Sequence, residues 1–141
     1  MKLLDVNAWL AAGWANHSHH AVVSHWLDRE EDDLVFCRVS QLAFLRLVSN
    51  PAVTGPYVLT RREAWAALET LAADVRVRFF QEPDGIEALW MALSRRDDRS
   101  HRLWTDDYLA AFARAAGATL VTLDAGFESR YPSVSVLTLH S

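Results

Sequence analysis

The sequence predicts an α/β fold in which helices cover both faces of a mostly parallel sheet. Short apolar runs alternate with longer segments whose apolar residues recur at helical spacing, and no repeat, low-complexity stretch or linker interrupts the alternation. The 141 residues suffice for a single domain, residues 1–141. A chain of this length buries about two-thirds of its unfolded surface, so it needs no disulfide or structural metal to fold.

The first part of the chain predicts a strand and two helices. Residues 2–7, KLLDVN, form a short apolar run that contains an acid, and residues 8–15 follow as a short helix. Residues 17–32 predict a second helix, because Val22 and Trp26 recur at helical spacing before a charged run.

The next segment predicts a strand, a helix and a loop. Residues 33–39, DLVFCRV, favour a strand of four to seven residues. Residues 40–51 predict a helix that Ser40 caps and that stops before Pro51. Residues 52–59 are expected to be loop.

A capping box marks the start of the following helix. Thr60 is its expected N-cap, with Glu63 three residues later, so residues 60–74 predict a helix. Residues 75–83 alternate before an apolar pair and predict the third strand.

The remaining elements are two helices and two strands. Residues 84–98 and 101–117 predict helices, the second ended by Gly117 as its C-cap. Residues 118–124, ATLVTLD, and 134–140, VSVLTLH, predict the last two strands.

Charge, cysteine content and hydropathy restrict the class of protein and the cellular compartment. A net charge of −4 argues against a general nucleic-acid coat protein. No apolar run approaches the ~20 residues of a membrane span, and Asp5 and Asn7 interrupt the N-terminal apolar stretch where a signal peptide must be continuous. With Cys37 as the single cysteine, the sequence predicts a cytoplasmic protein without membrane contact.

Three aspartates stand where a parallel sheet places its ligands. Asp5 ends the first expected strand, Asp124 ends the fourth, and Asp106 lies near a helix start that Thr105 can cap. The three carboxylates converge if the first and fourth strands are neighbours. A single aspartate at a strand end is more often a turn former or helix cap, and we interpret Asp107 in that way. For Asp5, Asp106 and Asp124, the spacing alone does not decide between such a structural role and a functional one.

Carboxylates that lie close together repel one another unless a cation lies between them. Two carboxylates about 5 Å apart repel by roughly 3 kcal/mol at an effective dielectric constant of about 20, which raises one pKa unless a cation intervenes. Oxygen ligands select Mg²⁺ or Mn²⁺ over zinc, and such a site activates water and stabilises a phosphodiester transition state. We therefore expect Mg²⁺ (or Mn²⁺) as the cofactor.

The segments KLLDVNAWLA, VSQLAFLRLVSNP and TDDYLAAFARAAGATLVTLDAGF resemble the PIN-domain family. They are most similar to its VapC branch, the toxin nucleases of bacterial toxin–antitoxin pairs. The resemblance spans essentially the whole chain and implies a three-layer α/β/α sandwich and a metal-dependent endoribonuclease. It implies that Asp5, Asp106 and Asp124 are catalytic and bind Mg²⁺ or Mn²⁺, with Asn7 and Thr122 as polar residues beside them.

The resemblance also implies binding partners, and the chain differs from the family pattern at one position. It implies an RNA substrate, a cognate antitoxin that reaches the acidic site with a basic side chain, and a homodimer, for which residues 42–48 and 64–73 offer apolar helix faces. Many PIN nucleases carry a further acid where this chain has the neutral Gln41. With Gln41 in place of an acid, the number of bound metal ions stays open. An alternative function also stays open, in which a catalytically weakened protein of this fold binds RNA or protein.

Two groups of polar side chains have competing interpretations. His17, His19, His20 and His25 lack a partnering cysteine, so we interpret them as a solvated or substrate-edge cluster rather than a zinc site. Four arginines precede Asp106, namely Arg95, Arg96, Arg99 and Arg102. They either complement the C-terminal dipole of the preceding helix or hold the RNA backbone beside the acids.

Overall fold

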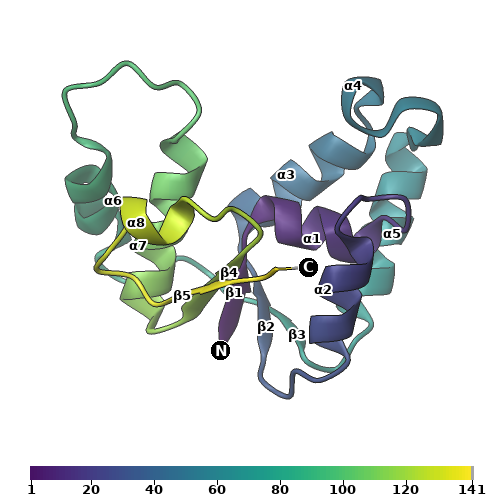
Figure 1. Cartoon of the computed structure of the whole chain (residues 1–141), viewed down its shortest axis with the longest axis horizontal. Helices are drawn as coiled ribbons and strands as arrows, with labels where there is room; N and C mark the ends of the chain where they lie inside the picture. The colour runs from purple at the N-terminus through teal and green to yellow at the C-terminus, as the bar shows by residue number, and fades with distance from the viewer. Residues whose placement is uncertain (141) are drawn as a thin grey trace.

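A five-stranded parallel sheet forms the centre of the molecule (Figure 1). The structure is a computed structural model that describes residues 1–140. The strands are β1 (Lys2–Leu4), β2 (Leu34–Phe36), β3 (Val77–Phe79), β4 (Thr119–Thr122) and β5 (Val136–Thr138). Their order is β3-β2-β1-β4-β5, and all four pairings are parallel. The first and fourth strands are therefore neighbours, with Leu3 opposite Leu120.

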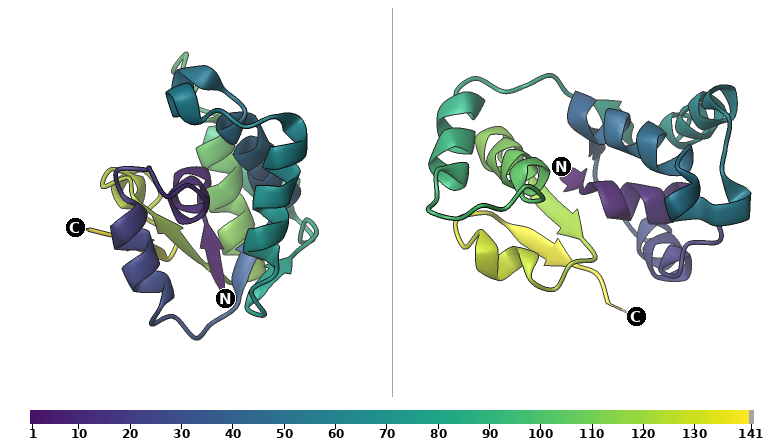
Figure 2. Two further views of the ribbon diagram at one scale, coloured as in Figure 1. Left: turned by 90° about the vertical axis from the view of Figure 1, so that its right-hand side faces the viewer. Right: turned by 90° about the horizontal axis from the view of Figure 1, so that it is seen from above.

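Helices cover both faces of the sheet and complete the predicted α/β/α sandwich. They are α1 (Val6–Gly13), α2 (His20–Leu27), α3 (Arg38–Val48), α4 (Pro51–Thr54), α5 (Arg61–Ala72), α6 (Ile86–Ser94), α7 (Trp104–Ala116) and α8 (Phe127–Arg130), with a 3₁₀ turn η1 (Gly55–Tyr57). Figures 1 and 2 show α1, α2, α3 and α5 on one side of the sheet and α6, α7 and α8 on the other. Within residues 1–140, no helix is both long and apolar enough to cross a membrane.

The sheet divides the core into two clusters because successive strand residues point to opposite faces. Leu3 packs with α7 residues such as Leu109 and Phe112, whereas Leu4 packs with the α1 and α3 side. On that second side Trp9 stacks on Phe36, with ring centroids 3.7 Å apart. Both faces of β1 are thus buried up to Leu4, the residue that precedes Asp5.

Several expected boundaries are wrong: β1 already ends at Leu4, and α1 begins at Val6. Helix α3 begins at Arg38 with Cys37 as its N-cap, so Ser40 is the third helical residue, and its hydroxyl accepts the Cys37 N–H at 3.0 Å. The second strand is correspondingly only three residues long. The predicted loop at 52–59 contains the end of α4 and all of η1, because Asn50 caps a short helix by accepting the Ala52 N–H at 3.0 Å.

Other local predictions are confirmed. Thr60 and Glu63 form the capping box of α5, with their side chains accepting each other's backbone N–H groups at 3.1 and 2.9 Å. Gly117 ends α7 with φ of 67°, a conformation that glycine adopts without strain.

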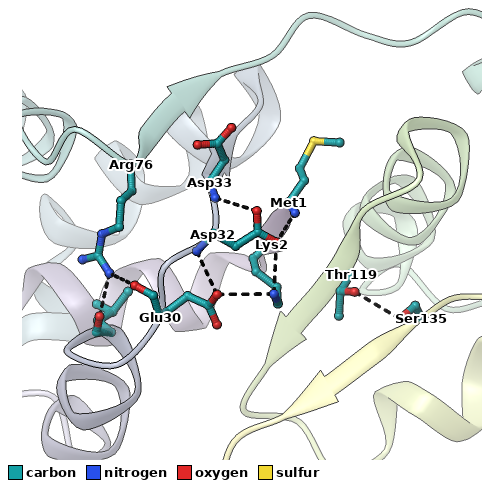
Figure 3. Close-up of polar contacts among 9 residues, drawn as sticks. Met1, Lys2, Glu30, Asp32, Asp33, Arg76, Thr119 and Ser135 are labelled. Carbon is teal, nitrogen blue, oxygen red and sulfur yellow. Dashed lines mark hydrogen bonds and ion pairs between the residues drawn. The ribbon is translucent and has the colours of Figure 1, made fainter.

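At the amino end of the sheet, acidic side chains have cationic partners (Figure 3). The Lys2 ammonium lies 3.2 Å from Asp32 and 3.4 Å from Glu30, and the N-terminal amine also pairs with Asp32. Hydrogen bonds from these two cations hold the pKa of Asp32 at about 2. Arg76 donates to the backbone oxygen of Glu30 and so ties the neighbouring loop to the sheet. These contacts are structural.

Candidate active site

Asp5 and Asp124 follow the adjacent strands β1 and β4 at the carboxyl edge of the sheet. Asp5 is the N-cap of α1, where its Oδ1 accepts the Ala8 N–H at 2.8 Å. The Thr122 hydroxyl donates to Asp5 Oδ2 and accepts the Asp124 N–H at 3.0 Å. Asp124 Oδ1 accepts the Gly126 N–H at 2.8 Å. Thr122 therefore links the two acids and fixes their orientation.

Asp106 enters the same region from the first turn of α7. Leu103 is the N-cap of that helix and Thr105 lies inside it, so the expected cap at Thr105 is wrong. Arg130 joins two of the acids, with its Nη2 2.6 Å from Asp124 Oδ2 and 3.3 Å from Asp106 Oδ2. The structure thus brings acids from three separate segments to one edge, with one guanidinium between two of them.

The environment separates the pKa values of the three carboxyls. Burial raises the pKa of Asp5 to about 6, hydrogen bonds from Thr122 and Ala8 oppose the rise, and the charges of Asp106 and Asp124 add to it. Burial also raises the pKa of Asp106, although Arg130 opposes that shift. The hydrogen bond from Arg130 lowers the pKa of the more exposed Asp124. Mutual repulsion at this edge is therefore present and only partly compensated.

The carboxylates at this edge are the kind of ligand that a hard divalent metal ion prefers. Among residues 1–140, no three His, Cys, Asp or Glu side chains stand close enough together to enclose an ion. The chemistry of Asp5, Asp106 and Asp124 nevertheless fits a hard divalent ion, because all their donors are carboxylate oxygens and a cation already lies between two of them.

Comparison with known proteins decides the family. The family model described as the PIN domain matches residues 2–131. The chain belongs to the PIN-domain family. It is 44% identical over 133 residues to the protein named Ribonuclease VapC41 of Mycobacterium tuberculosis (strain ATCC 25618 / H37Rv), covering 90% of this chain and 91% of the relative. Ribonuclease VapC39 of the same strain is 33% identical over 129 residues, which cover 87% and 88% of the two chains.

Solved structures show the same PIN-domain fold. VapC20 of Mycobacterium tuberculosis, a sarcin–ricin loop cleaving toxin, superposes with a TM-score of 0.70 at 19% identity, covering 92% of this chain and 94% of that one. VapBC2 of Rickettsia felis, bound to a promoter DNA fragment, superposes with a TM-score of 0.72 at 14% identity, covering 99% and 98%.

Asp107 of this PIN domain is neither a turn former nor a cap. It lies in the first turn of α7 with only 7% of its surface exposed, and it accepts a hydrogen bond from the Tyr131 hydroxyl. Burial, and next this hydrogen bond, raise the pKa of Tyr131, so the phenol stays protonated and available as a donor. Asp107 thus anchors α7 to the segment that carries Arg130. Sequence analysis missed both Arg130 and Tyr131; the basic residue six positions after Asp124 was the available signal.

Gln41 does not hydrogen-bond to a carboxylate in the described structure. Its Oε1 accepts from Arg38 Nη1 at 2.7 Å, and the Arg38 guanidinium carbon lies 4.5 Å from the centroid of the Phe79 ring. Gln41 still belongs to α3, which follows the end of β2 beside β1. Asn7 lies exposed in the first turn of α1, two residues after Asp5.

A cavity of about 350 Å³ is lined by Asp107 of α7 together with Arg130 and Tyr131. Its lining includes Arg96, Arg99, His101 and Arg130, but neither Arg95 nor Arg102. All four of the predicted arginines are exposed. Arg96 donates to the backbone oxygen of Arg130 at 3.3 Å, which connects the basic loop to the acidic edge. Two of the four arginines thus line the same cavity as Arg130, the residue that pairs with Asp106 and Asp124.

The histidines have local roles. His20 Nδ1 lies 2.7 Å from the Ala11 carbonyl oxygen, and His17 Nδ1 accepts the His19 N–H at 3.0 Å. Helix α2 begins at His20, so His17 precedes it.

Proposed function

We propose that this protein is a Mg²⁺- or Mn²⁺-dependent endoribonuclease and the toxin of a toxin–antitoxin pair. The observation that carries the proposal is the meeting of Asp5, Asp106 and Asp124 at one edge of the sheet. A 44% identical relative named a ribonuclease supports the choice of RNA as substrate.

The three aspartates would hold the ion, and the surrounding residues orient them. When bound, the ion supplies the Lewis acid that activates water and stabilises charge on the phosphodiester. Thr122 and the Ala8 N–H fix both oxygens of Asp5, and the Gly126 N–H fixes one oxygen of Asp124. Arg96 and Arg99 would hold the RNA backbone on the cavity side, since exposed cationic side chains bind phosphates without regard to sequence.

A protein partner and a second copy are the expected binding partners. Solved neighbours include VapBC-1 of nontypeable Haemophilus influenzae and FitAB bound to a DNA fragment, which supports a cognate antitoxin here. Helices α3 and α5 border an apolar cavity of about 360 Å³ lined by Leu42, Leu45 and Trp65. Leu42 is 57% and Trp65 54% exposed, so this face suits the predicted homodimer.

One observation favours the alternative function. Gln41 bonds to Arg38 and brings no charge to the acidic edge, as expected of a PIN-fold protein that has lost catalytic strength and binds RNA or protein instead.

Substitution of Asp106 distinguishes the two functions. Asp106→Asn is expected to abolish Mn²⁺-dependent cleavage of single-stranded RNA, while Asp97→Asn, an exposed loop change, should leave it intact. In metal-free buffer the melting temperature of Asp106→Asn should be unchanged or higher, because a repulsive charge is removed. Undiminished cleavage by Asp106→Asn would refute the catalytic assignment. Cation-independent RNA binding without cleavage by the wild type would establish the alternative.

A further inference from the structure

The Arg130 guanidinium occupies the space between two of the acids. A single nitrogen, Nη2, serves both Asp124 at 2.6 Å and Asp106 at 3.3 Å. The side chain extends from the single-turn helix α8, and its guanidinium carbon lies 5.6 Å from the ring centroid of Phe127 and 5.8 Å from that of Tyr131. The charged end of Arg130 therefore lies near two aromatic rings as well as the two carboxylates.

The pairing leaves part of the guanidinium unsatisfied. Arginine usually binds a carboxylate with two parallel N–H groups, whereas here one nitrogen bonds to both acids. Arg130 Nε is buried and has no hydrogen-bond partner among the described residues. The same side chain also lines the basic cavity beside Arg96 and Arg99. The guanidinium thus has a second environment within reach, on the side where a phosphate would bind.

We propose that Arg130 is a built-in counter-ion that pairs with Asp106 and Asp124 in the metal-free protein and gives up both carboxylates when a divalent ion binds. This inference rests on the proposed metal site. Two cations compete for the same oxygens, so the ion binds less tightly than three carboxylates alone would allow. The displaced guanidinium turns towards the cavity, where it faces the phosphate side of the site.

Arg130→Met tests the competition, because methionine keeps a long, unbranched side chain at this position but removes the charge. Arg114→Met is the matched control: Arg114 is exposed and donates to Ser133 at 3.2 Å. Mn²⁺ affinity of the full chain is measured by calorimetric titration at pH 7.5. Arg130→Met is expected to bind Mn²⁺ about tenfold more tightly than the wild type, equivalent to about 1.4 kcal/mol. Arg114→Met should match the wild type.

A metal-free measurement and a second variant complete the test. In EDTA, Arg130→Met should melt about 3 °C lower, since a partly exposed ion pair is lost and two carboxylates repel. Arg130→Lys retains the charge and should bind Mn²⁺ within about threefold of the wild type. The proposal that Arg130 competes with the ion through its charge would be overturned by either of two results. One is Mn²⁺ binding by Arg130→Met that is equal to or weaker than that of the wild type. The other is the same gain in Mn²⁺ affinity in Arg130→Met and Arg130→Lys. If wild type and Arg130→Met both fail to bind Mn²⁺ and to cleave RNA, the proposed function fails instead.

Discussion

Replacing Asp5 with asparagine is expected to stabilise the metal-free protein at neutral pH, even though Asp5 caps a helix. Burial, with a smaller contribution from the charges of Asp106 and Asp124, raises the pKa of this carboxyl from 3.8 to about 6. At 1.36 kcal/mol for each pH unit, ionised Asp5 costs the folded chain about 3 kcal/mol. Asparagine keeps an oxygen for the Ala8 N–H, whereas the hydrogen bond from Thr122 must rearrange at a cost of about 1 kcal/mol. The expected net gain is about 2 kcal/mol.

The sign of the pH dependence follows from the raised pKa. The folded chain binds the Asp5 proton more tightly than the unfolded chain does, so the stability that this proton contributes is fully present below pH 3.8. That contribution is lost as the pH rises and is absent above a pH of about 6. Asp5→Asn has no such proton. Its advantage over the wild type should therefore appear between these two pH values and persist at higher pH.

Urea unfolding in EDTA, followed by circular dichroism from about pH 4 to pH 8, measures this difference. At pH 7.5, Asp5→Asn should be about 2 kcal/mol more stable than the wild type, or about 6 °C higher in melting temperature. At pH 4 the gain should disappear. Asp97→Asn controls for a general charge effect. A difference between wild type and Asp5→Asn that is the same at both pH values would refute the claim that Asp5 is a repelled, buried carboxylate.

Two further predictions concern the metal and the oligomer. Gln41→Glu is expected to tighten Mn²⁺ binding by up to about tenfold, most clearly in an Arg38→Ala background, because Arg38 donates to Gln41 at 2.7 Å and would neutralise a new carboxylate. Calorimetry on the single and double variants checks this, and equal affinities throughout would mean that position 41 does not reach the ion. Trp65→Glu should convert a homodimer into monomers at about 30 µM, since Trp65 is 54% exposed beside Leu42. Sedimentation checks the mass, and a monomeric wild type would count against the dimer.

The sheet was predictable because its signals are local. The inner strands β1, β2 and β4 contain short apolar runs, and burial on both faces makes these runs continuous, whereas the edge strand β3 alternates. Helix ends were harder to predict, because a serine hydroxyl can accept a backbone N–H either from the N-cap position or from inside the first turn. The hydroxyl of Ser40 accepts the Cys37 N–H from inside the helix, so the same residue that suggests an N-cap marks the third helical position.

The acidic site was predictable only in part, because its one cation, Arg130, also pairs with an acid far away in the sequence. Asp5, Asp106 and Asp124 follow strand ends or start a helix, which the sequence displays, but Arg130 pairs with an acid 24 positions away through a turn that the sequence does not reveal. The buried Asp107 likewise accepts its hydrogen bond from Tyr131, 24 positions later in the chain.

The two ends of the sheet show why position alone does not identify function. At the amino end, Lys2 and the N-terminal amine lie against Asp32 and Glu30, so the acids there have cations that are fixed parts of the fold. At the carboxyl end, the Arg130 guanidinium contacts Asp106 and Asp124, and Asp5 keeps a raised pKa. Acids that lack enough positive charge carry a free-energy cost that packing alone does not explain. That unbalanced charge, rather than the presence of aspartates, is what distinguishes the proposed metal site from the structural ion pairs.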